Sequence, residues 1–367
     1  MPNPIQRTPL AAKPARPALP GAGLALGLFD KPKVSAQDTV TRSADPQVRP
    51  SAGMTPGQAG IYYSYTDAQR KQFDQVWSAV EPSGQKALIR LLEDGRLLSS
   101  KDMRKGDRLL THLDRLSTQA LPAGLSRAEL LGGLITQAQD PGTISQGDRG
   151  TCTVTTAEYM LASKSPAEYA RVVSDLSTTG GQVTLASGAK AHRIASSLKT
   201  DDSGRTSASR LFEAAMMEYG NGPLSYSNET DKHGIAGASF LSGGLTPLST
   251  TRVLSAALGE DYDTRTTLLG RDRLMRSLKD ALAEGQTVPI GMDWRGSTEK
   301  KRSGHEVLVL KIEDDRVYYR NPWGQTHSPG FETDGKTSPK RRIEDQSGVE
   351  SMALSEFRWR LDSISRK

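Results

Sequence analysis

Hydrophobic positions repeat with a helical period through most of the first 285 residues and form short strand-like runs after them. Apolar residues three or four positions apart predict helices over 66–80, 85–93, 101–116, 126–138, 152–163, 165–179, 209–219, 249–258 and 271–283. Apolar, β-branched and aromatic runs predict strands over 287–293, 306–312, 316–320, 348–354 and 357–364, with a weak hairpin over 182–195 and a glycine-rich loop over 234–244.

The chain divides into three parts by composition. Residues 1–60 hold ten of the twenty prolines and show no sustained periodicity, which predicts a disordered leader. Residues 61–140 predict a small subdomain of short helices, two of which begin with the capping-box residues Thr66 and Ser126. Residues 141–367 predict a main domain with a helical half followed by an antiparallel half, so the predicted fold class is α+β.

Charge and hydropathy exclude several classes of partner. Residues 1–60 carry seven basic and three acidic side chains, so they account for most of the net charge of +6. The remaining chain is nearly neutral, and its one basic run, 336–342, has no interleaved aromatic residues, which argues against nucleic-acid binding. No apolar run approaches the roughly 18 residues that a membrane span needs. The apolar run 19–29 imitates a secretory signal, but glycines interrupt it.

Cysteine and histidine usage excludes a metal site and points to a reducing compartment. The single cysteine, Cys152, cannot form an intramolecular disulfide or a thiolate metal site. No pair among the five histidines has metal-ligand spacing, and no phosphate or dinucleotide fingerprint is present, so we expect no metal and no cofactor. A free thiol suits the cytoplasm, or the cytoplasm of a target cell that receives the protein by secretion.

Cys152 stands at the predicted start of a helix, behind the glycine-containing loop 145–150. Backbone N–H groups at a helix N-terminus favour a thiolate, so we expect this position to lower the pKa of Cys152. Gln146, six residues upstream, offers an amide donor for an oxyanion beside the Cys152 N–H. A lone cysteine also suits an inert, buried structural role.

A histidine and an asparagine are predicted to meet across a later hairpin. His305 opens one strand and Asn321 follows the next, sixteen residues later, so a tight turn returns the chain to its starting point. The imidazole can accept the proton of a thiol, and an amide oxygen from Asn321 can orient the ring through its other nitrogen. Trp323 is placed to shield that hydrogen bond from water.

Taken together, these motifs resemble the papain-like cysteine peptidases over about residues 140–325, and Arg320-Asn321-Pro322-Trp323-Gly324 is especially similar to the calpain-type branch. The resemblance implies a two-lobe fold, with the cysteine on a helical lobe and the histidine and asparagine on an antiparallel β lobe. It assigns the nucleophile to Cys152, the general base to His305, the orienting group to Asn321 and an oxyanion donor to Gln146. It places Gly150, Asp293, Trp294 and Trp323 along the substrate groove.

The sequence departs from this pattern at two positions. Thr153 follows the nucleophile where these peptidases usually have tryptophan, and Glu306 follows the histidine where a small residue is common. No carboxylate loop matches the calcium sites of calpains. The sequence of 145–169 and the leader are also similar to papain-fold domains of secreted bacterial effectors and toxins, which implies secretion machinery or a target-cell protein as partner.

The main hypothesis is a cysteine endopeptidase acting on protein substrates through a thioester. The same residues also suit acyl transfer or deamidation, as in transglutaminase-like enzymes, although those usually orient the histidine with aspartate. A binding module that keeps the fold without activity is a third possibility. The helices over 61–140 suit shielding of the thiol, recruitment of a partner or packing alone.

Overall fold

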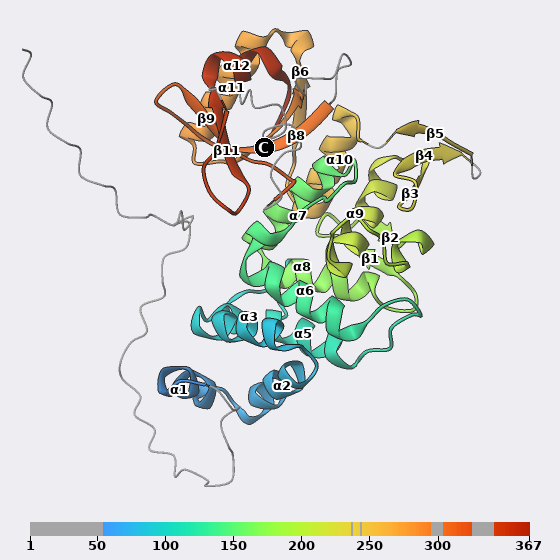
Figure 1. Cartoon of the computed structure of the whole chain (residues 1–367), viewed down its shortest axis with the longest axis vertical. Coiled ribbons are helices and arrows are strands. Elements are labelled where there is room, and N and C mark those ends of the chain that lie inside the picture. The colour runs from blue at the N-terminus through green and yellow to red at the C-terminus, as the bar shows by residue number, and fades with distance from the viewer. Residues whose placement is uncertain (1–53, 236–237, 243, 295–303, 325–340) are drawn as a thin grey trace, which may run out of the picture. The chain divides into compact units, whose positions relative to one another are not determined.

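The chain combines helices with antiparallel sheets, as the α+β prediction requires (Figure 1). The computed structural model describes residues 54–235, 238–242, 244–294, 304–324 and 341–367. Most of the predicted leader, residues 1–53, and the basic run up to residue 340 lie outside the described residues. No helix in the described ranges is both long and apolar enough to cross a membrane.

The first described helices begin at well-formed N-caps. Thr55 and Thr66 each accept a backbone N–H through the side chain and receive the reciprocal bond from a glutamine three residues later, so both form capping boxes. Ser126 caps a later helix by accepting the N–H of Glu129. These helices are α1 Pro56–Ser64, α2 Asp67–Ser78, α3 Pro82–Glu93, α4 Arg96–Ser99, α5 Leu109–Thr118 and α6 Arg127–Gln139.

The predicted boundary at residue 60 is wrong at its end, because α1 already begins at Pro56. Pro56 occupies the first turn, where its missing N–H costs nothing, and the capping box at Thr55 satisfies the exposed N–H groups. The buried ring of Tyr62 packs edge-on against Phe73 of α2. The proline content of the leader therefore obscured a short helix that tertiary contacts hold in place.

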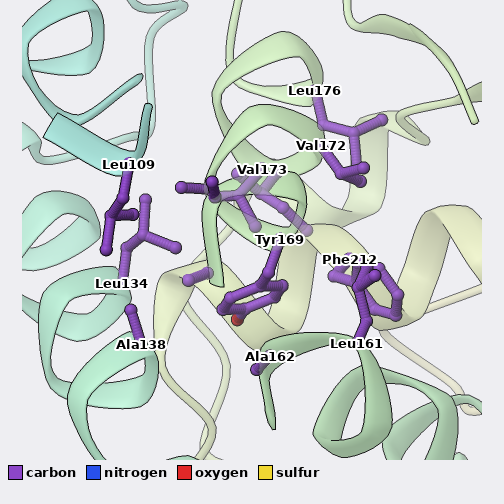
Figure 2. Packing of buried hydrophobic residues seen from close by; sticks show 14 of the residues in the cluster. Leu109, Leu134, Ala138, Leu161, Ala162, Tyr169, Val172, Val173, Leu176 and Phe212 are labelled. Carbon is purple, nitrogen blue, oxygen red and sulfur yellow. The ribbon is translucent and has the colours of Figure 1, made fainter. Parts of the chain in front are cut away.

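The helices over 61–140 share one hydrophobic core with the helices that follow Cys152. Figure 2 shows this packing, with Leu109 of α5 and Leu134 of α6 near Tyr169 of α8. The later helices are α7 Cys152–Lys164, α8 Pro166–Leu176, α9 Ser207–Gly220 and α10 Pro247–Leu258. Since residues 50–367 form one compact unit, the position of α7 depends on packing from both groups of helices.

The second hydrophobic core belongs to a seven-stranded antiparallel sheet with the order β10-β11-β9-β8-β7-β12-β6. Helix α11, Arg271–Ala283, packs against β7, β8 and β12. Helix α7 packs against β8, which brings the start of the cysteine helix to the sheet (Figure 1). The strands are β6 Asp263–Thr266, β7 Val288–Asp293, β8 Gly304–Glu313, β9 Arg316–Arg320, β10 Arg341–Ile343, β11 Val349–Ala353 and β12 Leu361–Arg366.

Two short sheets lie outside this arrangement. The predicted hairpin is confirmed as β1 Gln182–Thr184 and β2 Lys190–His192. The predicted glycine-rich loop over 234–244 is wrong, because β4 Lys232–Ile235 and β5 Ala238–Ser242 pair there, with β3 Ser225–Ser227 at the edge of the sheet. Backbone pairing does not need side chains, so a glycine-rich segment forms strands when a partner strand is adjacent.

The last predicted strand is partly wrong. Residues 354–360 form helix α12, Leu354–Arg360, and only the following segment pairs as a strand. Phe357 points into the core of the sheet from this helix, and Arg360 bonds Glu356 one turn earlier. The aromatic residues that suggested a strand serve instead to anchor one helical turn.

Candidate active site

His305 and Asn321 meet as the hairpin register predicts. His305 is the second residue of β8, and Asn321 directly follows β9. The turn between these strands has positive φ at Asp314 and Asp315, which matches the twist of a tight hairpin. Nε2 of His305 lies 3.0 Å from Oδ1 of Asn321, and the two side chains are 6% and 1% exposed.

The surroundings of Asn321 fix the direction of this hydrogen bond. Oδ1 of Asn321 also accepts the backbone N–H of Trp323 at 3.3 Å, and Nδ2 donates to Oε1 of Glu350 at 3.0 Å. The amide oxygen therefore faces the histidine, so Nε2 of His305 carries the proton and Nδ1 carries the lone pair. A ring in this tautomer can accept a proton at Nδ1.

Glu350 and Tyr319 are site residues that the sequence reasoning missed. Glu350 lies on β11 directly opposite Tyr319 of β9, and its Oε2 accepts the Tyr319 hydroxyl at 3.1 Å. All of these side chains are buried, so the His305–Asn321 pair ends in a carboxylate and a phenol rather than in water. The signal in the sequence is an acidic residue inside a strand that is otherwise buried, but its partner is visible only from the strand pairing.

Two tryptophans enclose the imidazole. Trp323 stacks on the His305 ring, with centroids 4.2 Å apart and an interplanar angle of 17°. Trp294, which follows β7, lies 4.8 Å from the same ring and 5.5 Å from Trp323. Trp323 thus lies where shielding of the hydrogen bond was predicted. The indole of Trp294, predicted to line a groove, is 5% exposed and packs against the histidine.

Asp293 and Gly150, the other predicted groove residues, are held by the protein itself. Asp293 ends β7, and its carbonyl accepts a bond from Arg360 at 2.9 Å. The backbone N–H of Gly150 donates to Oδ2 of Asp231 at 2.7 Å, and Tyr226 donates to the other oxygen of that carboxylate. The Gly150 N–H is therefore already engaged, and Asp231 anchors the loop that precedes the cysteine.

Cys152 is the first residue of α7, as predicted, but the expected low thiol pKa is wrong. The backbone N–H groups of Thr153 and Glu306 face the sulfur and lower its pKa, in the direction that a helix N-terminus predicts. Burial outweighs them, because the side chain is only 8% exposed, and it raises the pKa of Cys152 to about 11. The resting thiol is therefore protonated at neutral pH.

The thiol lies beside the strand that carries the histidine. Its neighbour Glu306 is the residue next to His305 on β8, and α7 packs along that strand. Among the hydrogen bonds of the described residues, none joins Cys152 to His305. Burial lowers the pKa of His305 to about 4, although the bond to Asn321 opposes this change. The resting imidazole is therefore neutral, like the thiol.

Gln146 holds its loop against the asparagine turn. Its backbone N–H donates to the carbonyl of Pro322 at 2.9 Å, and its buried side chain donates through Nε2 to the Arg149 carbonyl at 2.5 Å. One of the two amide hydrogens on Nε2 remains for a ligand. Gly147 permits this loop, because φ is +58° and a Cβ would lie 1.8 Å from the Ser203 carbonyl oxygen.

Further bonds join the cysteine loop to the end of β9. Ser145 donates through Oγ to the Trp323 carbonyl at 2.8 Å. Arg320 is buried, donates to the Ile144 carbonyl at 2.5 Å and lies over the Tyr159 ring at 4.0 Å. The segments that carry the predicted nucleophile and the predicted orienting asparagine are therefore linked directly, and we call these contacts the loop clamp.

A buried polar network supports the start of α7. Thr151 and Thr155 donate to Glu213 of α9 at 2.7 and 2.8 Å, and Arg205 donates to the same carboxylate at 3.0 Å. Burial and the charge of Glu213 raise the pKa of nearby Glu158 well above its usual value, so Glu158 is protonated at neutral pH. The first turn of the cysteine helix thus rests on bonded carboxyl groups.

Two other features in the described part of the chain do not extend this site. Asp102, Asp107 and His112 bring possible metal ligands within 4.8 Å of one another. Asp102, however, already accepts backbone N–H groups from residues 104–107 and a bond from His112. A hollow of about 1160 Å³ near Trp359 contains none of the predicted site residues.

In comparisons with known proteins, no family model matches the sequence, and no curated protein is significantly similar to it.

Proposed function

We propose that the chain is a cysteine peptidase with a papain-like two-lobe arrangement, in which Cys152 is the nucleophile and His305 the general base. The main support is the hydrogen bond from Nε2 of His305 to Oδ1 of Asn321, beside the strand residue whose N–H faces the Cys152 sulfur. The loop clamp adds support, because it fixes the cysteine loop against the asparagine turn.

The catalytic cycle begins from a neutral thiol and a neutral imidazole. Substrate binding excludes water, and the proton moves from Sγ of Cys152 to Nδ1 of His305 as the sulfur attacks the scissile carbonyl. The Asn321 oxygen stabilises the imidazolium through Nε2. The Cys152 N–H and the remaining Gln146 amide hydrogen are the candidate donors to the oxyanion.

Collapse of the tetrahedral intermediate completes acylation. The imidazolium of His305 gives its proton from Nδ1 to the leaving amine, the C–N bond breaks, and a thioester forms at Cys152. Water then attacks the thioester, His305 accepts its proton, and the acid product leaves as the thiol is restored. Trp294 and Trp323 keep bulk water from the His305–Asn321 bond through both halves of the cycle.

Because Cys152 is the only cysteine, its chemistry can be followed without ambiguity. The purified protein and its Cys152→Ala variant are incubated with a cell extract, and new peptide termini are sequenced. We expect new termini with the native chain and with the control His192→Ala, whose histidine is exposed, but not with Cys152→Ala or His305→Ala. Cleavage that survives in Cys152→Ala rules out the proposal.

The alternative acyl transfer is separated by adding an excess of a primary amine. Incorporation of the amine into a glutamine-bearing substrate without new termini would replace peptidase activity by transfer. Orientation of His305 by an amide rather than a carboxylate favours hydrolysis. A protein substrate in a reducing compartment, including a target cell reached by secretion, remains part of the proposal because the thiol must stay reduced.

A further inference from the structure

Glu306 is a buried carboxyl group that the proposed catalytic cycle does not use. It follows His305 on β8 and is 5% exposed. In the described ranges no cation acts on it, its Oε1 has no hydrogen-bond partner, and burial raises its pKa to about 8. An acidic side chain this deeply buried normally has an ion pair or several donors, so Glu306 lacks the partner that its position requires.

The strand beside Glu306 provides room for a ligand. Glu306 pairs with Gly291 of β7, and Gly291 pairs in turn with Ser363 of β12. A Cβ placed on Gly291 would lie 2.3 Å from Oγ of Ser363 and 3.6 Å from Oε2 of Glu306. The glycine thus leaves the carboxyl group without a side chain opposite it, between the strand backbone and the hydroxyl of Ser363.

Glu306 also acts on the thiol in two opposed ways. Its backbone N–H stabilises the Cys152 thiolate, whereas the negative charge of its carboxylate raises the thiol pKa. A cation bound to the carboxylate would cancel that repulsion and leave the N–H in place. The charged groups that face Glu306 are thus the thiol of Cys152 and the carboxyl group itself, and a bound cation would favour ionisation of both.

We propose that the Glu306 carboxylate binds a positively charged side chain of the substrate, lysine or arginine, next to the bond that Cys152 attacks. The substrate assignment rests on the proposed peptidase function. The cation supplies the missing partner of the buried carboxylate and activates the thiol at the same time. Substrate choice and activation of the nucleophile are therefore coupled through one residue.

The cation site is tested first without any peptide. Methanethiosulfonates transfer their thioalkyl group to the Cys152 thiolate, forming a mixed disulfide as the S–S bond of the reagent breaks and sulfinate leaves. Aminoethyl, ethyl and sulfonatoethyl reagents differ in charge at similar size. Because all three react with the same thiolate, the ratio of the cationic to the neutral rate is independent of the thiol pKa.

We expect the native chain to prefer the aminoethyl over the ethyl reagent, after correction for their intrinsic rates. Glu306→Gln should reduce that preference by about tenfold or more, since a hydrogen bond between charged groups is lost. Glu313→Gln is the matched control, because Glu313 is exposed at the far end of the same strand. A preference that is absent, or unchanged in Glu306→Gln, overturns the proposal.

Peptide cleavage is the second readout. Fluorogenic peptides that differ only in arginine, lysine, leucine or glutamate at positions flanking the bond are compared between native chain and Glu306→Gln. We expect kcat/KM for the basic peptides to fall about tenfold or more in the variant, with little loss on leucine peptides. Equal loss on all peptides, or cleavage without any basic preference, overturns the proposal while the peptidase function stands. A charge preference in the reagents without hydrolysis of any peptide preserves the cation site and overturns the peptidase function.

Discussion

Asn321 links His305 to Glu350: its oxygen accepts the imidazole N–H, and its nitrogen donates to the Glu350 carboxylate at 3.0 Å. Glu350 therefore fixes which end of the amide faces the histidine. Without that acceptor, the Asn321 side chain can rotate and present its N–H₂ group to Nε2, which would favour the opposite tautomer. Glu350 acts through Asn321 and is a positioning residue.

Replacement of Glu350 should separate its orienting role from its packing role. We expect Glu350→Leu to lower the free energy of unfolding by about 1–3 kcal/mol, because the buried Asn321 amide and Tyr319 hydroxyl lose their acceptor. Proteolytic kcat should fall with little change in KM, and its acidic pH limit should shift as the histidine tautomer changes.

Glu350→Gln is the conservative control, because its side-chain oxygen still accepts from Asn321 and its amide can donate to Tyr319. It should restore most of the kcat and the native pH limit. If Leu and Gln variants lose the same activity while only the Leu variant is less stable, Glu350 does not orient Asn321.

The alkylation rate of Cys152 should reveal the resting protonation state. Burial holds the pKa of the thiol at about 11 and that of His305 at about 4, so the free protein contains no ion pair at neutral pH. The rate with iodoacetamide should rise about tenfold per pH unit through the neutral range, as expected for a thiolate fraction far below its pKa. Mass spectrometry of the single cysteine gives this rate directly.

Two variants sharpen that profile. Glu306→Gln should move the upper limb to lower pH, because the Glu306 charge raises the thiol pKa, whereas His305→Ala should leave the upper limb in place. A plateau of high reactivity below neutral pH, lost in His305→Ala, would instead demonstrate a thiolate–imidazolium pair in the resting protein.

Local sequence patterns predicted the parts of the site that short stretches of chain determine. The turn at Asp314 and Asp315 returns β9 alongside β8, so the meeting of His305 and Asn321 follows from the spacing of one hairpin. The helix start at Cys152 also follows from local periodicity. These features need no knowledge of the rest of the fold.

Other parts of the site depend on distant segments. Trp294 reaches the His305 ring because β7 pairs with β8 across residues 295–303, whose placement lies outside the described residues, and Glu350 reaches Asn321 because β11 pairs with β9. The thiol pKa was mispredicted for the same reason. The helix N-terminus is a local feature that lowers it, whereas burial arises only when α7 packs against β8.

The stability of the protein should depend on pH through Glu306. Burial raises the pKa of this carboxyl group from 4.5 to about 8, so between these values the unfolded chain releases a proton that the folded chain retains. Stability from this group is complete below pH 4.5 and is lost as the pH rises towards 8. At about 1.4 kcal/mol per pKa unit, the loss is roughly 3–5 kcal/mol.

Chemical denaturation of the native chain and Glu306→Gln across this range measures the effect. The variant should gain stability relative to the native chain as the pH rises, and contributions from His305 cancel in the difference. Glu313→Gln, which removes an exposed carboxylate from the same strand, should give a flat difference. A flat difference for Glu306→Gln as well would mean that the carboxyl group is not desolvated.

Gly147 should be the least replaceable glycine of the cysteine loop. Its φ of +58° disfavours any side chain, and a Cβ would also lie 1.8 Å from the Ser203 carbonyl oxygen. Gly188 is a matched control, because its φ is +89° and a Cβ there would meet no atom of the described residues within 4 Å. Gly188→Ala should therefore cost about 1 kcal/mol for backbone strain alone.

Gly147→Ala should cost more than Gly188→Ala, since the backbone contact cannot be relieved by turning a side chain. Movement of the loop would also break the Gln146–Pro322 bond of the loop clamp, so the Cys152 modification rate should change in Gly147→Ala and not in Gly188→Ala. Thermal unfolding and iodoacetamide labelling of the two variants test both effects. Equal stability and equal labelling would show that the loop can move away from Ser203 without disturbing the thiol, and that the loop clamp does not position Cys152.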